Sequence, residues 1–482
     1  MRSLPLPALS LTSFVMFTAV LAVATTPTIT VKSPANNAEV ISAVNYVASA
    51  TSSGCAAGMS SMEVYSQPGF LAYGTSGGSM DTYLSLQPGT YNTTVQAWDL
   101  CGGYAKVNIK ITITSASVGA GFFYVTEPDN NKVQGFAISS QGSLTAIPQG
   151  AVATNVYPWS VAADKGGYRL YVGDYKSGDV FAYFINHTNG YLSPVPGSPF
   201  PVDHSVTSVA VHPSGDYVYA TRDEYHPGDG IAAFHVNSNG SLTEIAGSPF
   251  TTQANPWSVT VDPTGKYLYV TFPSSGQIGG YNIESSGELT ELQGSPFTVP
   301  RGGNACSTIA SPNDFVDFAG KYAYSADWIN DQIDGFAIAG DGALTNVAGA
   351  PWLDNGGCGA PNQAGDGGYN PGWVAVDGTG KFLYAINQSF GNISIYSINS
   401  TGGLTFVKNT TPLPPPCRYA PIVTDPAGNF LYQQGCYDKD ATTFNSVVGY
   451  TINHSTGDLT PVPGSPFFTN TDFNVLGMAT TP

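Results

Sequence analysis

The sequence predicts an all-β fold, and three observations support this prediction. One phrase of four short strands recurs seven times after residue 120. Gly, Pro, Asn, Asp and Ser separate the strands, and these residues supply the backbone angles that turns need. The chain contains 56 glycines and 35 prolines but only 10% charged residues, which is typical of a β-rich protein with many turns.

The phrase is clearest between residues 256 and 297. Four runs there, SVTV, YLYVTF, IGGYNIE and LTELQ, each have about 5 residues, the usual length of a strand. The segments DPTG, SSG and SSGE separate these runs, and GSPF closes the unit. The phrase therefore predicts four consecutive antiparallel strands joined by tight turns.

Two residues mark the copies: a tyrosine in the second strand and a leucine after the third turn. The tyrosines are Tyr124, Tyr171, Tyr219, Tyr269, Tyr324, Tyr384 and Tyr432, and the leucines are Leu144, Leu192, Leu242, Leu289, Leu344, Leu404 and Leu459. Successive tyrosines lie 47 to 60 residues apart. Four-stranded units at this period predict a seven-bladed β-propeller over residues 121–482, in which each unit covers its neighbour.

The two ends of this region indicate how the ring closes. The first copy begins at Phe122, which corresponds to the second strand of the phrase, so its inner strand is missing there. The last residues, Val475–Pro482, match the inner-strand pattern of Val259–Pro263. We therefore expect the C-terminal strand to complete the first blade and to remove an exposed sheet edge.

Residues 1–24 are predicted to be a secretory signal. Arg2 is their only charge, an apolar run extends from Leu9 to Ala24, and Ala22-Val23-Ala24 is a small-x-small cleavage site. The alternative is an uncleaved membrane anchor, although the run contains Ser and Thr and is short for a span. We expect cleavage, no further transmembrane segment, and a monomer that is secreted, periplasmic or held at the cell surface.

Residues 27–115 are predicted to form a separate β-sandwich. Six segments have strand character: Thr28–Val31, Val40–Val47, Met62–Tyr65, Tyr83–Leu86, Tyr91–Trp98 and Val107–Ile113. The phrases Leu86-Gln-Pro-Gly-Thr-Tyr91 and Val95-Gln-Ala-Trp98 resemble bacterial immunoglobulin-like domains. Cys55 and Cys101 lie in loops of this unit, and a disulfide between them would stabilise it by roughly 4 kcal/mol in the chain-entropy model.

The other four cysteines lie in the propeller region, on loops that enter inner strands or leave second strands. We predict two further disulfides, Cys306–Cys358 and Cys417–Cys436. A metal site is the alternative, but no two of these cysteines have the close spacing of zinc ligands. The net charge of −17 argues against nucleic acid as a partner, because phosphate binding needs a basic surface.

Polar and aromatic residues gather on the loops that a propeller brings to one face. Arginine is scarce, and Arg222, Arg301 and Arg418 all fall on these loops, as does His204. Further candidates for substrate binding are the carboxylates three residues after a blade tyrosine and the tryptophans that enter inner strands: Glu127, Asp174, Asp327, Trp159 and Trp257. The set predicts a ligand-binding mouth on this face.

The repeat, with its DPxGxxLYV and GxLTxxxGSPF motifs, resembles the lactonase family of seven-bladed propellers. That family includes 6-phosphogluconolactonase-like proteins and the fungal carboxymuconate-lactonising enzyme, and the resemblance covers residues 121–482. It implies hydrolysis or isomerisation of a lactone or sugar acid. We expect no cofactor and no metal ion. The resemblance also implies a His, Arg and Glu set at the mouth, for which His204, Arg222 and Glu224 are the candidates, assisted by Arg301 or Arg418.

Such an enzyme would hold a substrate carboxylate or phosphate with arginines, use His204 or Glu224 as general base, and stabilise the oxyanion with an arginine. The alternative is a non-catalytic surface propeller whose tryptophans bind a glycan or protein partner by stacking and apolar contact. A quinone-cofactor dehydrogenase is a third possibility on architecture alone. Gly74–Gly78 matches a serine-hydrolase elbow, but we predict a glycine-rich turn there because no helix follows.

Overall fold

The computed structural model describes residues 26–41, 44–67, 70–84, 89–114, 121–147, 151–154, 156–223, 230–300, 317–327, 330–353, 371–387, 391–411, 421–435, 446–468 and 477–482. The chain divides into two compact units, Met1–Thr114 and Ser115–Pro482. The predicted signal, Glu224, Arg301, Arg418, Cys306, Cys358, Cys417 and Cys436 lie outside the described residues. No helix among the described residues is long and apolar enough to span a membrane.

The first unit is a sandwich of two sheets. One sheet has the order β1 (Thr28–Ser33), β3 (Val44–Thr51), β6 (Ser79–Leu84). The other has the order β2 (Ala38–Ile41), β8 (Tyr104–Thr114), β7 (Gly89–Asp99), β4 (Met59–Gln67), β5 (Phe70–Ser76). Tyr46 and Met80 from the first sheet pack in one core with Met62, Val95 and Ile111 from the second. The immunoglobulin-like character of this sandwich stays a prediction.

Strand β5 differs from the sequence prediction. Gly74 lies inside this strand opposite Glu63, and the turn comes only at Gly77, which has φ of +85°. The prediction of a turn beginning at Gly74 was therefore wrong by three residues. Alternation is a weak signal in this edge strand, because Leu71 and Tyr73 are both exposed although they are large and apolar.

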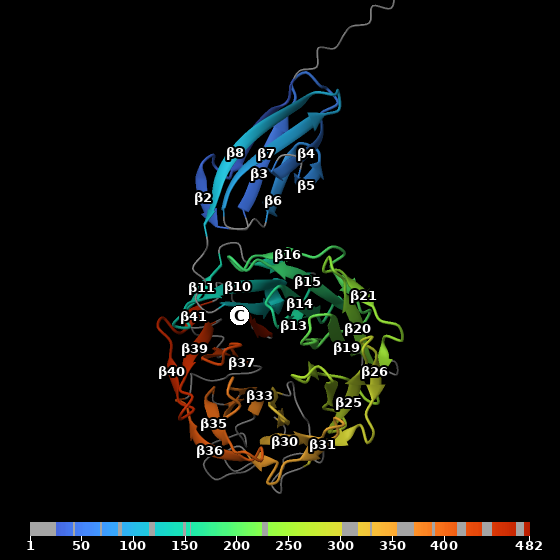
Figure 1. The fold of residues 1–482 in the computed structure, drawn as a ribbon, viewed down its shortest axis with the longest axis vertical. Coiled ribbons are helices and arrows are strands. Elements are labelled where there is room, and N and C mark those ends of the chain that lie inside the picture. The colour runs from blue at the N-terminus through green and yellow to red at the C-terminus, as the bar shows by residue number, and fades with distance from the viewer. Residues whose placement is uncertain are drawn as a thin grey trace, which may run out of the picture. The chain divides into compact units, whose positions relative to one another are not determined.

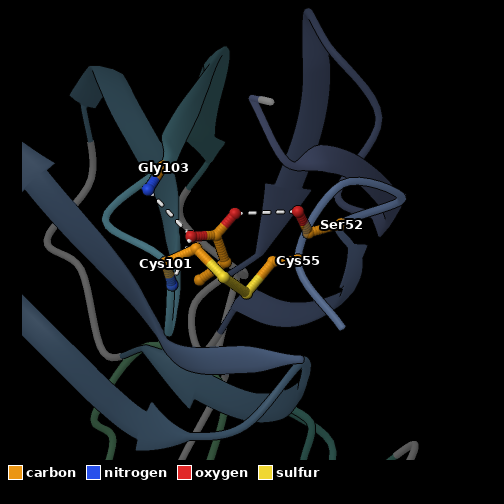
Figure 2. The surroundings of a disulfide bond; sticks show 5 residues. Ser52, Cys55, Cys101 and Gly103 are labelled. Atoms are coloured by element: carbon orange, nitrogen blue, oxygen red, sulfur yellow. Dashed lines mark hydrogen bonds between the residues drawn. A yellow bond between two sulfur atoms is a disulfide. The ribbon is translucent and has the colours of Figure 1, made fainter. Parts of the chain in front are cut away.

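Cys55 and Cys101 form a disulfide with a Cα–Cα distance of 5.8 Å, the pairing expected from the sequence (Figure 2). Beside it, the Asp99 carboxylate accepts hydrogen bonds from the Ser52 hydroxyl at 2.7 Å and the Gly103 amide at 2.8 Å. The Ser52 hydrogen bond is the largest cause of the lowered pKa of Asp99. This loop pair is thus joined both covalently and by a charged acceptor.

The second unit is a ring of seven sheets, which follow one another around the ring in chain order (Figure 1). Blade 1 contains β9 (Gly121–Glu127), β10 (Lys132–Ile138), β11 (Leu144–Ala146), β12 (Val152–Ala153) and β42 (Met478–Thr480), with the short 3-10 helix η1 (Pro128–Asn130) between β9 and β10. Blade 2 contains β13 (Pro158–Ala163), β14 (Arg169–Asp174), β15 (Asp179–Ile185), β16 (Leu192–Pro194) and β17 (Phe200–Pro201). The predicted all-β, seven-bladed propeller is confirmed.

The remaining blades repeat this plan. Blade 3 contains β18 (Val209–Val211), β19 (Tyr217–Arg222), β20 (Gly230–Val236), β21 (Leu242–Glu244) and β22 (Phe250–Thr251). Blade 4 contains β23 (Val259–Val261), β24 (Tyr267–Phe272), β25 (Gln277–Ile283), β26 (Leu289–Glu291) and β27 (Phe297–Thr298). Blade 5 contains β28 (Asp317–Ala319), β29 (Tyr322–Asp327), β30 (Gln332–Ile338), β31 (Leu344–Asn346) and β32 (Trp352–Leu353).

Blade 6 contains β33 (Pro371–Val376), β34 (Phe382–Asn387), β35 (Ile393–Ile398) and β36 (Leu404–Asn409). Blade 7 contains β37 (Ile422–Thr424), β38 (Phe430–Gln434), β39 (Ser446–Ile452), β40 (Leu459–Pro461) and β41 (Phe467–Phe468). In each blade the second strand lies between the first and the third, and all are antiparallel. Every blade therefore presents its first strand to the centre of the ring.

The two ends of the propeller region meet in one sheet. The last strand, β42, pairs with β9 so that Met478 lies opposite Val125, Ala479 opposite Tyr124 and Thr480 opposite Phe123. The C-terminus accordingly lies inside the ring in Figure 1. This is the pairing that the sequence pattern predicts, and it leaves the second strand of blade 1 without an open edge.

The blade tyrosines join neighbouring blades. Each is fully buried, and six of the seven donate a hydrogen bond to a glycine carbonyl in the next blade, as Tyr269 does to Gly342 at 2.8 Å. Tyr432 of the last blade bonds to Gly142 of the first at 2.9 Å. The tyrosine that marks the repeat in the sequence is therefore also the residue that ties the ring together.

Candidate functional site

The inner strands begin, and the second strands end, at the same face of each blade. Pro158 lies opposite Asp174 in blade 2, and Pro371 lies opposite Asn387 in blade 6. This register follows from antiparallel pairing of the first two strands. The loops that carry most of the predicted site residues are therefore joined to this end of the sheets, which we call the mouth.

A cavity of about 310 Å³ lies between the inner strands of blades 1, 2, 3, 4, 6 and 7. It is lined by Ser160, Val161, Val209, Thr260, Trp373, Val374, Ala375, Pro421, Ile422, Val423, Thr424, Gly477 and Met478. None of these described lining residues is charged. The cavity thus offers apolar surface with a few hydroxyl groups, and none of the described charged candidates lines it.

The structure brings the loop of His204 against Arg222. The Arg222 Nε donates to the Val202 carbonyl at 3.1 Å, and the Asp223 amide donates to the Ser205 carbonyl at 3.0 Å. His204, which lies between those two acceptors in the sequence, is half-buried. One predicted catalytic pair, His204 and Arg222, is therefore held at the junction of blades 2 and 3.

Gly178 also holds the loop of His204 in place. The amides of Val202 and Asp203 both donate to its carbonyl, at 2.8 and 3.1 Å. Its φ is +70°, and a side chain there would lie 2.9 Å from the His204 backbone. A residue other than glycine would therefore strain the turn and displace the loop of His204.

Asp174 and Glu127 are predicted substrate ligands that the structure buries completely. The Asp174 carboxylate accepts four backbone N–H groups, from Val156, Tyr157, Lys176 and Ser177, at 2.9–3.2 Å. These bonds organise the two loops at the mouth of blade 2. Contact between this carboxylate and a substrate stays a prediction.

Glu127 forms an ion pair with Lys132, in which Oε2 and Nζ are 3.0 Å apart, and accepts a hydrogen bond from the Asn130 amide at 3.2 Å. Its other oxygen, Oε1, is buried and has no hydrogen-bond partner among the described residues. The pair links the two strands on either side of η1. Its part in substrate binding stays a prediction.

Asp327, the third predicted carboxylate, belongs to a fully buried polar group in blade 5. It accepts a hydrogen bond from the Asn330 side chain at 2.7 Å, and the Gln332 amide donates to Asp334 at 2.8 Å and to the Pro300 carbonyl at 2.9 Å. Burial, followed by the nearby charge of Asp327, raises the pKa of Asp334 well above its ordinary value.

Trp159 and Trp257 come together although they belong to blades 2 and 4. Their ring centroids are 6.0 Å apart at an interplanar angle of 82°, an edge-to-face contact. Both side chains are half-buried. Two predicted substrate-binding residues are therefore adjacent at the mouth.

The sequence analysis missed two tyrosines that extend this contact. Tyr175 lies 5.1 Å from Trp159, and Tyr157 lies 6.1 Å from Trp159 and 6.5 Å from Tyr175, measured between ring centroids. Lys176 places its Nζ 4.1 Å from the centroid of the Tyr157 ring. The available signal was the position of both tyrosines beside Pro158 and Asp174, which are paired across the sheet.

Among the described residues, one group of three potential metal ligands has its ligand atoms close together: Cys55, Asp99 and Cys101. The disulfide uses both sulfur atoms of that group. In chemical terms the mouth combines a half-buried imidazole, a positioned guanidinium and an aromatic surface. These groups can hold an anionic or carbonyl-bearing ligand and move a proton.

Comparison with known proteins agrees with the resemblance drawn from the repeat. The family model described as "Lactonase, 7-bladed beta-propeller" matches residues 191–306. No curated protein sequence matches the chain. The family match includes His204, Arg222, Glu224 and Arg301, so it spans most of the predicted catalytic and arginine positions.

Three solved structures share the fold. A periplasmic gluconolactonase from Pseudomonas aeruginosa has a TM-score of 0.57 and 18% identity, and the match covers 72% of this chain and 97% of that one. A candidate 6-phosphogluconolactonase from Bacteroides fragilis has a TM-score of 0.57 and 18% identity over 77% of this chain and 100% of that one. Another from Bacteroides uniformis has a TM-score of 0.59 and 16% identity over 75% and 99%. The similarity to lactonase-family propellers is thereby confirmed.

Proposed function

We propose that this protein hydrolyses a lactone derived from a sugar acid at the mouth of the propeller. His204 acts as general base, with Glu224 as the alternative, and Arg222 stabilises the oxyanion. Arg301 and Arg418 bind a carboxylate or phosphate of the substrate. The observation that carries this proposal is the Arg222 Nε bond to the Val202 carbonyl, which holds the guanidinium beside the loop of His204.

The reaction needs one water molecule and no electron acceptor. The base removes a proton from water as its oxygen attacks the lactone carbonyl carbon, and the negative charge develops on the carbonyl oxygen. A guanidinium beside that oxygen lowers the barrier, because its N–H groups are already oriented before the charge appears. The ring C–O bond then breaks, the departing oxygen takes the proton, and a hydroxy acid is released.

The similar proteins support a lactone-hydrolysing function. The family match covers the segment that contains His204, Arg222, Glu224 and Arg301. The similar structures include proteins described as a gluconolactonase and as candidate 6-phosphogluconolactonases. A small lactone with several hydroxyl groups is therefore the substrate class that we favour.

We further propose that the mature protein is an exported monomer. The apolar segment at residues 1–24 and the disulfide between Cys55 and Cys101 support export, because disulfides persist in oxidising compartments. One of the similar structures is also described as periplasmic. The predicted pairs Cys306–Cys358 and Cys417–Cys436 belong to the same proposal, and mass spectrometry of the unreduced protein would identify them.

The test is hydrolysis of a lactone panel by the purified mature chain, followed as acid released at constant pH. The panel contains glucono-δ-lactone, its 6-phosphate and a simple aliphatic δ-lactone. We expect Arg222→Lys to lower kcat/KM by about a hundredfold, as for loss of an oxyanion donor, and His204→Gln by at least as much.

Arg169→Lys is the matched control. Arg169 is the first residue of β14, where its Nη1 is 3.5 Å from the Asp164 carboxylate, and this change should leave kcat/KM unaltered. Wild-type rates in both mouth variants would refute the assigned roles. A complete lack of turnover on the panel would instead support the alternative, a non-catalytic propeller that binds a glycan or protein partner.

A further inference from the structure

Four aromatic side chains make one continuous surface at the mouth. The rings of Trp159, Trp257, Tyr157 and Tyr175 are linked by centroid distances of 5.1–6.5 Å, and all four side chains are half-buried. Aromatic rings that serve only the core are usually enclosed, as Tyr171 is here. We call this group the aromatic wall.

The wall spans blades that are not neighbours. Trp159 belongs to the inner strand of blade 2 and Trp257 precedes the inner strand of blade 4, so blade 3 lies between them in the ring. Their edge-to-face contact therefore joins two sides of the mouth. The Trp159 ring is tilted against Tyr175 and lies edge-to-face with Trp257, so the rings of the wall are not parallel to one another.

The backbone beneath the wall is fixed by hydrogen bonds. Thr207 donates its hydroxyl to the Trp257 carbonyl at 2.6 Å, and Thr126 donates to the Trp159 carbonyl at 3.3 Å. The Tyr175 amide donates to the Tyr157 carbonyl at 3.0 Å. Because these anchors come from blades 1 and 3 as well as blade 2, the rings are held in position before any ligand arrives.

A buried hydroxyl in the same strand as Trp159 lines the central cavity. Ser160, which directly follows Trp159, is 5% exposed, and its Oγ has no hydrogen-bond partner among the described residues. Ser160 and Thr260 are hydroxyl-bearing members of a cavity lining that is otherwise largely apolar. A buried polar atom without a partner is unfavourable unless a ligand or water completes it.

We infer that the aromatic wall and Ser160 form a subsite for a sugar ring. The C–H face of a pyranose is flat and apolar enough to stack on indole and phenol rings, while its hydroxyl groups need partners such as the Ser160 hydroxyl. Lys176 at the edge of the wall adds a positive charge for a sugar carboxylate. This inference deepens the proposed function, because it names a pyranose-type sugar as the part of the lactone that is recognised.

Binding is tested with the full mature chain and two pyranose probes that contain no lactone, methyl β-glucuronoside and methyl β-glucoside. Calorimetry gives Kd, and a change in tryptophan fluorescence that is lost in Trp257→Ala reports binding at the wall. We expect both probes to change the fluorescence, and Trp257→Ala to weaken binding by about tenfold, the loss of one stacking contact. Ser160→Ala should also weaken binding, and it serves as a second variant if Trp257→Ala folds poorly.

Trp352→Phe is the matched control, because Trp352 lies on the outer strand β32 of blade 5. It should leave probe binding unchanged. Equal affinity of wild type, Trp257→Ala and Ser160→Ala, or no response to either probe at millimolar concentration, would overturn the subsite. Thermal unfolding of each variant identifies any loss of folding.

The same variants separate the subsite from the proposed hydrolysis. If both hold, Trp257→Ala raises KM for glucono-δ-lactone but leaves KM for the aliphatic δ-lactone unchanged. Probe binding without turnover of any lactone would retain the subsite and reject the hydrolase. Turnover that is insensitive to Trp257 and Ser160 would retain the hydrolase and reject the subsite.

Discussion

One blade tyrosine differs from the other six in the hydrogen bonding of its hydroxyl group. Tyr171 is fully buried like the others, but its hydroxyl has no hydrogen-bond partner among the described residues. In the next blade, Tyr219 bonds to the Gly287 carbonyl at 3.0 Å. The same residue in the same place of the repeat therefore makes different contributions to stability.

We predict opposite effects for one substitution at two blades. Tyr269→Phe removes the bond to Gly342 and should lower the free energy of unfolding by about 1–2 kcal/mol. Tyr171→Phe removes an unpaired buried hydroxyl and should leave stability unchanged or raise it. Urea unfolding of the two variants measures both, and equal losses would show that the hydroxyls contribute alike.

The buried carboxyl of Asp334 predicts a pH dependence of stability. Burial, reinforced by Asp327, raises its pKa in the folded chain, so the folded state holds a proton that the unfolded state releases more easily. The protonated Asp334 carboxyl makes its full contribution to folding stability at pH values below its unfolded pKa near 4. This contribution is lost as the pH rises towards the pKa of Asp334 in the folded chain. Asp334→Asn should therefore stabilise the protein at pH 7 more than at pH 4, as measured by urea unfolding. An equal effect at both pH values would contradict the raised pKa.

At the residue scale the sequence predicted part of the site. Trp159 and Trp257 were candidates because each enters an inner strand, and the structure places them in contact. Tyr157 and Tyr175 were missed, because only the pairing of their loops brings them to Trp159. Ser160 carried no signal at all, since an unpaired hydroxyl is a property of its surroundings and not of the local sequence.

At the scale of elements, one aspartate organises the DPxG turn of blade 4. The buried Asp262 carboxylate accepts the amides of Thr264, Lys266 and Tyr267 at 2.8–3.0 Å, as well as the Thr264 hydroxyl at 2.6 Å. One side chain thus holds the connection between the first and second strands. Gly265, with φ of +74°, completes the turn.

Asp262→Ala should lower the free energy of unfolding by about 2 kcal/mol, because it leaves several turn amides without their acceptor. Asp341→Ala is the matched control, since Asp341 is exposed and accepts one backbone amide, from Ala343 at 3.1 Å. That change should cost about 0.5 kcal/mol or less. Similar losses at the two positions would refute the assigned role of the buried turn carboxylate.

Strand boundaries were predicted well where alternation and turn residues agree, as in blade 4. The GSPF segment was predicted only as the end of a unit, whereas Phe297 and Thr298 pair with Ile278 and Gln277 of the third strand. Two residues are too few to show a period, so this pairing is set by tertiary contacts.

At the scale of the propeller, seven hydrophobic clusters alternate with seven sheets. Each cluster combines residues of two neighbouring blades, and the one between blades 7 and 1 includes Phe123, Tyr432 and Val447. No blade buries both of its faces alone, so the arrangement depends on an unbroken ring. The repeat period predicted this architecture, because a period is a global property that survives local variation.

The ring closure is the feature on which the mouth depends, because Gly477 and Met478 line the same cavity as Ser160. The Gly477 amide also donates to the Thr126 hydroxyl at 2.7 Å, and Thr126 anchors Trp159. Loss of the last strand would therefore expose the edge of β9 and loosen the aromatic wall together.

The most direct measurement compares the mature chain with a variant that ends at residue 476, by thermal unfolding at one scan rate and by binding of methyl β-glucuronoside. We predict that removal of β42 lowers the stability by at least about 3 kcal/mol, because three residue pairs with β9 and the buried Ala479 are lost, and that it abolishes binding. An unchanged midpoint with full binding would contradict a ring closed by its C-terminal strand.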